Sequence, residues 1–253
     1  MSQHHFEAGP GETLDILFGG RIKMLQPSRG YRFSIDAMLL ADFVRPGLGG
    51  IMVDLGCGCG VIPIVLGLKS GTCRVTGIEI QPELAELARK NVSLNQLDGR
   101  INVLTRDLKE TPQILPPESA DAVTANPPYR RLNSGRINSD FQKAVARHEI
   151  KANLGDVLAA ARYLLKVQGQ LWLVYPAVRV GHLFNELAAA SMEPKRIRFV
   201  HSNGESPATL VLMEAVKGGG EGAVVEKPLY IYDPAGRYTQ EMDRVFNFCP
   251  AAI

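Results

Sequence analysis

Residues 51–60 read IMVDLGCGCG, and this stretch decides the fold. Its first half is a short apolar run that contains an acidic side chain, Asp54, near its end, as expected of a buried strand that leads into a ligand site. Three glycines follow at alternate positions, Gly56, Gly58 and Gly60. Glycines let the backbone turn sharply and approach a ligand closely. The stretch therefore predicts a strand, a tight turn and the start of a helix.

Strands and helical patterns continue to alternate after this stretch. Short apolar segments at residues 73–80, 101–107 and 121–126 are separated by helical patterns, which is typical of a parallel sheet with helical crossovers. The strand QLWLVY and two later strands, RIRFV and ATLVLMEAV, extend the sheet. The last two are joined by the short loop HSNGESP, so they should form an antiparallel hairpin. We predict an α/β fold with a Rossmann-like, seven-stranded, mostly parallel sheet and an antiparallel edge hairpin, which binds ligands beyond the carboxyl ends of its strands.

Length and composition fit one such domain preceded by a leader. The chain has 253 residues, of which 45% are hydrophobic and 21% are charged, enough for one sizeable core. Residues 30–44, GYRFSIDAMLLADFV, end in an apolar periodic stretch that predicts a helix beginning at Ser34 or Asp36. We expect residues 1–48 to form the leader and residues 49–253 the main domain.

Composition also limits the partners. The net charge of +2 at pH 7 is too small to indicate nucleic acid by itself. The four cysteines give no disulfide framework of the secreted kind, so a cytoplasmic location fits best. Cys57 and Cys59 have no second cysteine pair or histidine cluster near them in sequence, so we expect no metal. No apolar run approaches the ~20 residues that span a bilayer, so we expect no membrane contact.

The acids around the glycine turn favour a cationic ligand over a pyrophosphate. Asp54 would repel a pyrophosphate, and the glycine spacing is G-x-G-x-G rather than G-x-G-x-x-G. Glu79 ends the next strand about twenty residues later, where a carboxylate can accept hydrogen bonds from both ribose hydroxyls. Asp107 and Leu108 follow the third strand, near the expected adenine ring. We expect Asp54 and Glu79 at exposed strand ends. The alternative interpretation of the glycine stretch is a dinucleotide site or only a tight strand-to-helix turn.

This pattern resembles the class I methyltransferase family. The resemblance implies S-adenosyl-L-methionine as cofactor, with the matching positions Asp54, Gly56, Gly58, Gly60, Glu79 and Asp107.

The fourth strand ends in Asn126-Pro127-Pro128-Tyr129, beside the expected ligand. An exocyclic amine on an aromatic ring is a poor nucleophile because its lone pair is delocalised. The Asn126 side-chain oxygen and the Pro127 carbonyl can each accept one amine hydrogen, which leaves the lone pair directed at the methyl group. Tyr129 offers a face on which an unpaired base can stack. The alternative is that the prolines only end a strand and that Tyr129 belongs to the core.

The tetrapeptide resembles amino-methyltransferases, which include adenine-N6 enzymes and glutamine-N5 enzymes acting on release factors. The leader segment GYRFSID, residues 30–36, and the closing LYIYDPAGRYTQEM, together with NPPY, resemble the bacterial tRNA(Val) adenine-N6 methyltransferase family. This resemblance implies an enzyme that methylates the N6 amine of an adenine near the anticodon of tRNA, its RNA partner. It also implies that Tyr31, Phe33 and Asp36 cover the cofactor, which Asn126 borders. A glutamine-N5 enzyme and a non-enzymatic nucleotide-binding module are the alternatives.

Overall fold

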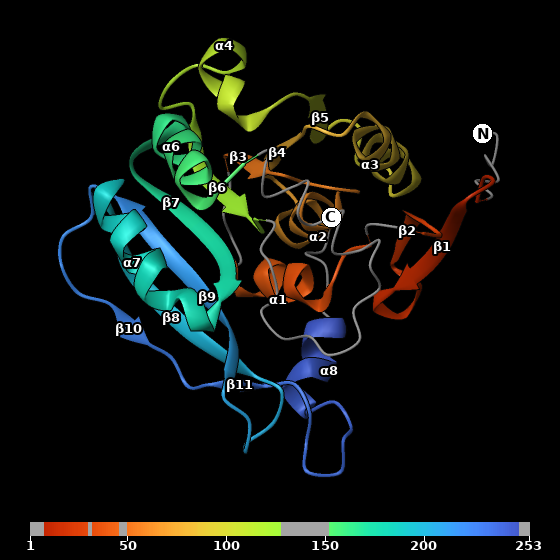
Figure 1. Ribbon diagram of the computed structural model, residues 1–253. Helices are drawn as coiled ribbons and strands as arrows, with labels where there is room; N and C mark the ends of the chain where they lie inside the picture. Colours follow the sequence, from red (N-terminus) through yellow and green to blue (C-terminus); the bar gives the residue numbers. More distant parts are fainter. Residues whose placement is uncertain (1–7, 30–31, 46–49, 128–151, 248–253) are drawn as a thin grey trace.

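The computed structural model describes residues 8–29, 32–45, 50–127 and 152–247. Five parallel strands form the centre of one sheet in the order β5-β4-β3-β6-β7 (Figure 1). They are β3 (Ile51–Leu55), β4 (Arg74–Glu79), β5 (Ile101–Thr105), β6 (Ala120–Ala125) and β7 (Leu165–Pro176). The order reverses between β3 and β6, which is where ligands bind in sheets of this kind.

The antiparallel part of the sheet follows β7. Strand β9 (Ala208–Lys217) lies between β7 and β8 (Met192–His201) and is antiparallel to both. These seven strands confirm the predicted fold class. Two strands of two residues each, β10 (Val224–Val225) and β11 (Leu229–Tyr230), pair with the outer side of β8. The hairpin is therefore present as predicted, but β8 does not end the sheet.

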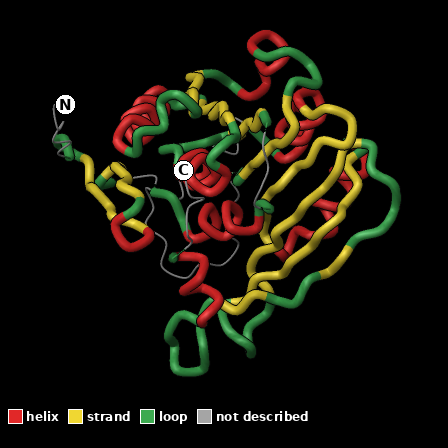
Figure 2. The backbone as a smooth tube through the Cα atoms, turned by 180° about the vertical axis from the view of Figure 1, so that it is seen from behind, coloured by secondary structure: helices red, strands yellow, loops and turns green. Residues whose placement is uncertain are grey.

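Helices cover both faces of the sheet, as the two views in Figures 1 and 2 show. Apolar side chains of α6 and α7 share one buried cluster with inward residues of β6, β7 and β9. Side chains of α1, α2, α3 and α8 belong to a second cluster on the other face. The helices are α1 (Ile35–Phe43), α2 (Val61–Ser70), α3 (Pro82–Leu94), α6 (Leu154–Leu164), α7 (Val180–Ala189) and α8 (Gln240–Phe246), with short turns η2 (Leu108–Glu110), α4 (Thr111–Ile114) and η3 (Ala177–Arg179).

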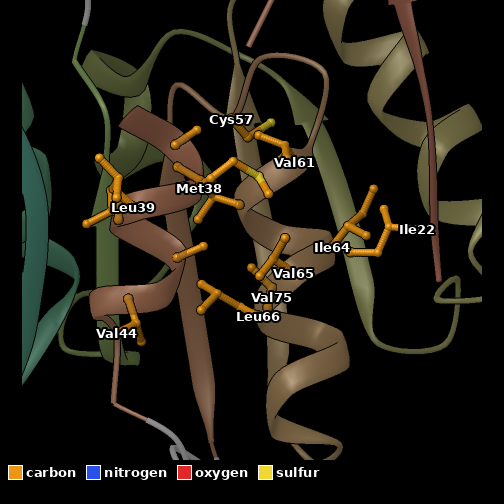
Figure 3. Packing of buried hydrophobic residues seen from close by; sticks show 14 of the residues in the cluster. Ile22, Met38, Leu39, Val44, Cys57, Val61, Ile64, Val65, Leu66 and Val75 are labelled. Atoms are coloured by element: carbon orange, nitrogen blue, oxygen red, sulfur yellow. The ribbon is translucent and has the colours of Figure 1, made fainter. Parts of the chain in front are cut away.

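The leader contains a hairpin that composition did not indicate. Strands β1 (Glu12–Leu17) and β2 (Ile22–Pro27) are antiparallel and are joined by the turn η1 (Phe18–Gly20). Helix α1 follows and has Ser34 as its N-cap residue, one of the two expected starts. Figure 3 shows Ile22 beside Ile64 of α2, and the leader shares one apolar cluster with α2. The division at residue 48 stays a prediction.

Helix α1 has apolar side chains on most of its surface, and neighbouring elements bury it on several sides. Met38 points toward α2, where Val61 and Val65 lie, whereas Leu39 lies on the side of α1 that faces away from α2 (Figure 3). Helix α8 contributes Met242 to the same cluster. In the described part of the chain, no helix combines the length and the apolar character needed to cross a membrane.

We expect Gly60→Ala to lower the free energy of unfolding by about 1–2 kcal/mol. Gly60 has φ +89°, which strains any residue with a Cβ, and that Cβ would lie 3.2 Å from the Ala88 side chain. Gly204 has no positive φ and open space at its Cβ position. Urea unfolding should therefore leave Gly204→Ala within about 0.5 kcal/mol of the wild type. Equal effects of the two substitutions would contradict the constraint at the turn.

Candidate active site

The glycine turn between β3 and α2 bends back over the end of β4. The backbone N–H groups of Gly56 and Cys57 both donate to the Ile78 carbonyl, at 2.8 and 3.1 Å. Gly56, Gly58 and Gly60 all have positive φ. The glycines at alternate positions therefore form the tight strand-to-helix turn that the sequence predicts.

Glu79, the last residue of β4, is buried under this turn, with 5% of its surface exposed. Its Oε2 accepts from the Gly58 backbone N–H at 2.9 Å. Its Oε1 accepts from the backbone N–H and the side-chain amide of Gln81, at 2.9 and 3.1 Å. The expectation of an exposed strand end is wrong for Glu79, because three N–H donors replace the water that a carboxylate would otherwise need.

Asp54 is also buried, with 1% of its surface exposed, so the expected exposure is wrong here too. Thr124 of β6 donates its hydroxyl to Oδ1 of Asp54 at 2.5 Å. Oδ2 has no hydrogen-bond partner among the described residues. Burial, and to a smaller extent the nearby Glu79 charge, raise the pKa of Asp54 to about 7, although the Thr124 bond opposes the shift. A buried, unpartnered carboxylate oxygen is suited to an N–H donor or a cation from a ligand.

Asp107 and Leu108 lie beyond β5, at the same edge of the sheet as Glu79. Asp107 is the N-cap of η2, and its Oδ1 accepts from the Lys109 backbone N–H at 3.0 Å. Leu108 is buried in the cluster that also contains Ile78. Asp107 thus acts as a turn residue, and its other oxygen lies 3.5 Å from the Lys109 ammonium.

Asn126 and Pro127 follow β6 directly, next to β3 in the sheet. Leu55 and Ala125 are partners in the register, so Asn126 and Gly56 leave the sheet side by side. Asn126 is partly buried and Pro127 is buried. The expected stacking residue Tyr129 and its neighbour Pro128 lie outside the described residues.

Two of the three leader residues expected at the site are described. Phe33 is partly buried against the α1–α2 cluster, and its backbone N–H donates to the Gln26 side chain at 3.0 Å. Asp36, in the first turn of α1, is buried. Tyr31 lies outside the described residues.

Thr124 and Gln81 support the two carboxylates, and the sequence analysis missed both. A signal for Thr124 was available: it is a polar residue within the apolar run from Ala122 to Ala125, two positions before Asn126. Residues two apart in a strand share a face. No local pattern identifies Gln81, because its role depends on how Glu79 turns inward.

The two cysteines of the turn are buried. Burial raises the pKa of the Cys59 thiol to about 12 and that of Cys57 well above its ordinary value, so both thiols stay protonated at neutral pH. Within the described ranges, no three His, Cys, Asp or Glu side chains gather as a candidate metal site.

Comparison with known proteins agrees with this geometry. The methyltransferase small domain family matches residues 34–180. A tRNA1(Val) (adenine(37)-N6)-methyltransferase of Porphyromonas gingivalis strain ATCC 33277 is 27% identical over 91% of this chain and 93% of its own length. A protein of the same name from strain W83 is 30% identical over 67% of this chain and 68% of its own length.

Solved structures share the fold. A predicted O-methyltransferase from Agrobacterium tumefaciens superposes with a TM-score of 0.69 at 24% identity, over 84% of this chain and 95% of its own. M. jannaschii TYW2 in complex with AdoMet superposes with a TM-score of 0.55 at 15% identity, over 83% of this chain and 88% of its own. The family match covers more than half of the chain. The chain therefore belongs to the methyltransferase small domain family and, within it, to the family of the tRNA1(Val) adenine-N6 methyltransferases.

Proposed function

We propose that this chain transfers a methyl group from S-adenosyl-L-methionine to the exocyclic N6 amine of an adenine in tRNA, at the position that the names of its relatives give as 37. One observation carries the proposal. Asn126 and Pro127 leave β6 next to the turn that covers Asp54, whose buried Oδ2 has no partner among the described residues. An amine acceptor pair and a site for a cationic donor molecule therefore adjoin each other.

The residues of the site fit the cofactor in chemistry. When bound, S-adenosyl-L-methionine supplies an electrophilic methyl group on a sulfonium. We assign the ammonium of its amino-acid part to Asp54, directly or through a water. A carboxylate has about four acceptor positions, and Glu79 already uses three, so we assign one ribose hydroxyl to it rather than the two expected.

The remaining cofactor assignments rest on position. Asp107 and Leu108 stand beyond β5 on the adenine side, where Leu108 offers apolar surface and Asp107 can accept from the amino group. Phe33 and Asp36, with Tyr31, are proposed to cover the cofactor from the leader. The turn glycines Gly56, Gly58 and Gly60 let the backbone approach it.

Asn126 and Pro127 act on the amine. Each oxygen accepts one amine hydrogen, which favours the pyramidal nitrogen whose lone pair can attack. Once the methyl group has moved from sulfur to nitrogen, leaving a neutral thioether, the nitrogen is positively charged and releases its proton to solvent water, so no strong base is needed. Holding nitrogen and methyl in line supplies much of the rate enhancement. Tyr129 is proposed to stack on the adenine base.

A tRNA substrate is favoured over a protein glutamine because both relatives are named as tRNA adenine-N6 methyltransferases, and each is similar to this chain over most of its length. We propose a cytoplasmic location, which a tRNA substrate and the cysteine content both favour. The tRNA assignment is tested by transfer of a labelled methyl group to total tRNA from cells that lack the enzyme. N6-methyladenosine in the digested tRNA supports the proposal, whereas label on a release-factor glutamine would overturn it.

Asp54 should make cofactor binding depend on pH. Because its pKa is raised to about 7, the ionised form, which attracts an ammonium, increases between about pH 6 and pH 7.5. The Kd for S-adenosylhomocysteine should therefore fall by up to about tenfold over this range. Asp54→Asn keeps the acceptor for Thr124 but does not ionise, so this variant should have a higher Kd that does not change with pH. Parallel profiles in calorimetric titrations of the two proteins would contradict the ammonium assignment.

Asn126→Ala should lower single-turnover methyl transfer at saturating cofactor by about a hundred- to thousandfold, by analogy with the loss of one oxyanion-hole donor worth about 2.7–4 kcal/mol. Its Kd for S-adenosylhomocysteine should change by no more than a few-fold, since the lost contact is made to the amine. Asn102→Ala, at an exposed position of β5, is the matched control and should react normally. Near-normal turnover of Asn126→Ala would show that the mechanism is wrong.

A further inference from the structure

One face of α3 holds both the glycine turn and the leader strand β2. Ala88, Asn91 and Asn95 lie three and four residues apart, so they share a side of the helix. Ala88 lies against Gly60, which has no side chain to prevent the close approach. Asn91, and Asn95 as the residue that caps the C-terminal end of α3, continue the contact toward β2.

Asn91 bonds to both elements at once. It is fully buried. Its Oδ1 accepts from the Leu25 backbone N–H at 2.7 Å, and its Nδ2 donates to the Leu25 carbonyl at 2.9 Å. The same Nδ2 donates its second hydrogen to the Cys59 carbonyl, also at 2.9 Å. The side-chain amide thus uses both of its N–H groups, one on the leader and one on the turn.

Asn95 makes the same kind of contact with the leader but none with the turn. Its Oδ1 accepts from the Lys23 backbone N–H at 3.0 Å, and its Nδ2 donates to the Lys23 carbonyl at 2.7 Å. The second hydrogen goes to the Asn91 carbonyl within the helix. The two asparagines together pair with β2 as the edge of a neighbouring strand would, and only Asn91 extends the pairing to the site.

Strand β2 is in turn hydrogen-bonded to the segment that precedes α1. Gln26, the residue after Leu25, is buried and accepts from the Phe33 backbone N–H. Its side-chain amide also donates to Asp15 of β1. Phe33 is one of the residues proposed to cover the cofactor, so the position of β2 determines the position of this cover.

We infer that Asn91 is a positioning residue for the cofactor site: it fixes the glycine turn and the leader strand to one point of α3, so that the two sides of the site are set together. This inference rests on the proposed function for the identity of the ligand. Asn91 does not reach the reacting atoms in this arrangement; it acts through Cys59 on the turn and through Leu25 on the leader.

Asn91→Leu and Asn95→Leu form the matched pair that tests the inference. Each removes an amide that pairs with β2, so both should lower the midpoint of thermal unfolding without ligand. Only Asn91→Leu should raise the Kd for S-adenosylhomocysteine, by about tenfold, and KM for the methyl donor with it, while kcat at saturating donor stays within a few-fold. Equal weakening in both variants, or no weakening in the Asn91 variant, would overturn the inference.

Asn91→Ala with Asn95→Ala serves as the second pair if the leucine variants do not fold, since alanine removes the amide without adding bulk or a buried charge. The wild type gives an independent reading by hydrogen exchange. S-adenosylhomocysteine should slow exchange of the Leu25 amide, bonded to Asn91, more than that of the Lys23 amide, bonded to Asn95. Equal slowing of the two amides would count against a special role for Asn91. Wild-type protein that does not bind S-adenosylhomocysteine at all would instead contradict the proposed function.

Discussion

The burial of two carboxylates, Asp54 and Glu79, beneath one glycine turn is the constraint on which the site depends. A buried carboxylate must be hydrogen-bonded, paired with a cation or protonated. Glu79 meets this need with three N–H donors, one of them the Gly58 amide of the turn. Among the described residues Asp54 has a single donor, Thr124, and burial raises its pKa. The difference leaves Asp54 as the carboxylate with capacity for a cationic ligand.

The strand register connects this constraint with the amine acceptors. Asp54 and Thr124 are direct partners in the pairing of β3 with β6, so their hydrogen bond lies across the point where the strand order reverses. Asn126 lies two residues after Thr124, just beyond the end of β6. A change in the register of β6 would separate Thr124 from Asp54 and move Asn126 away from the turn. One strand pairing therefore sets the positions of both Asp54, the proposed cofactor acid, and Asn126, the proposed amine acceptor.

The parallel core and the order of the motifs could be predicted because they depend on local patterns. Apolar periodicity and turn glycines belong to short stretches of chain, and the carboxyl ends of parallel strands meet at one edge of the sheet. Burial of Asp54 and Glu79 could not be predicted, since it depends on donors from the folded turn and from β6. The β1–β2 hairpin was missed for a related reason. The free edge of β2 is hydrogen-bonded to the side chains of Asn91 and Asn95, which are distant from it in sequence.

Ion pairs between residues distant in sequence also limit which basic side chains are available to bind nucleic-acid phosphates. Arg196 and Arg198 lie two residues apart in β8, one strand of the hairpin. Arg196 pairs with Glu214 and Glu226 and lies over the Phe43 ring, and Arg198 pairs with Glu241. A cation that is already neutralised and partly buried releases few counterions from a phosphate backbone. These two arginines therefore hold the hairpin to α1 and α8, and the proposed tRNA substrate would gain few phosphate contacts from them.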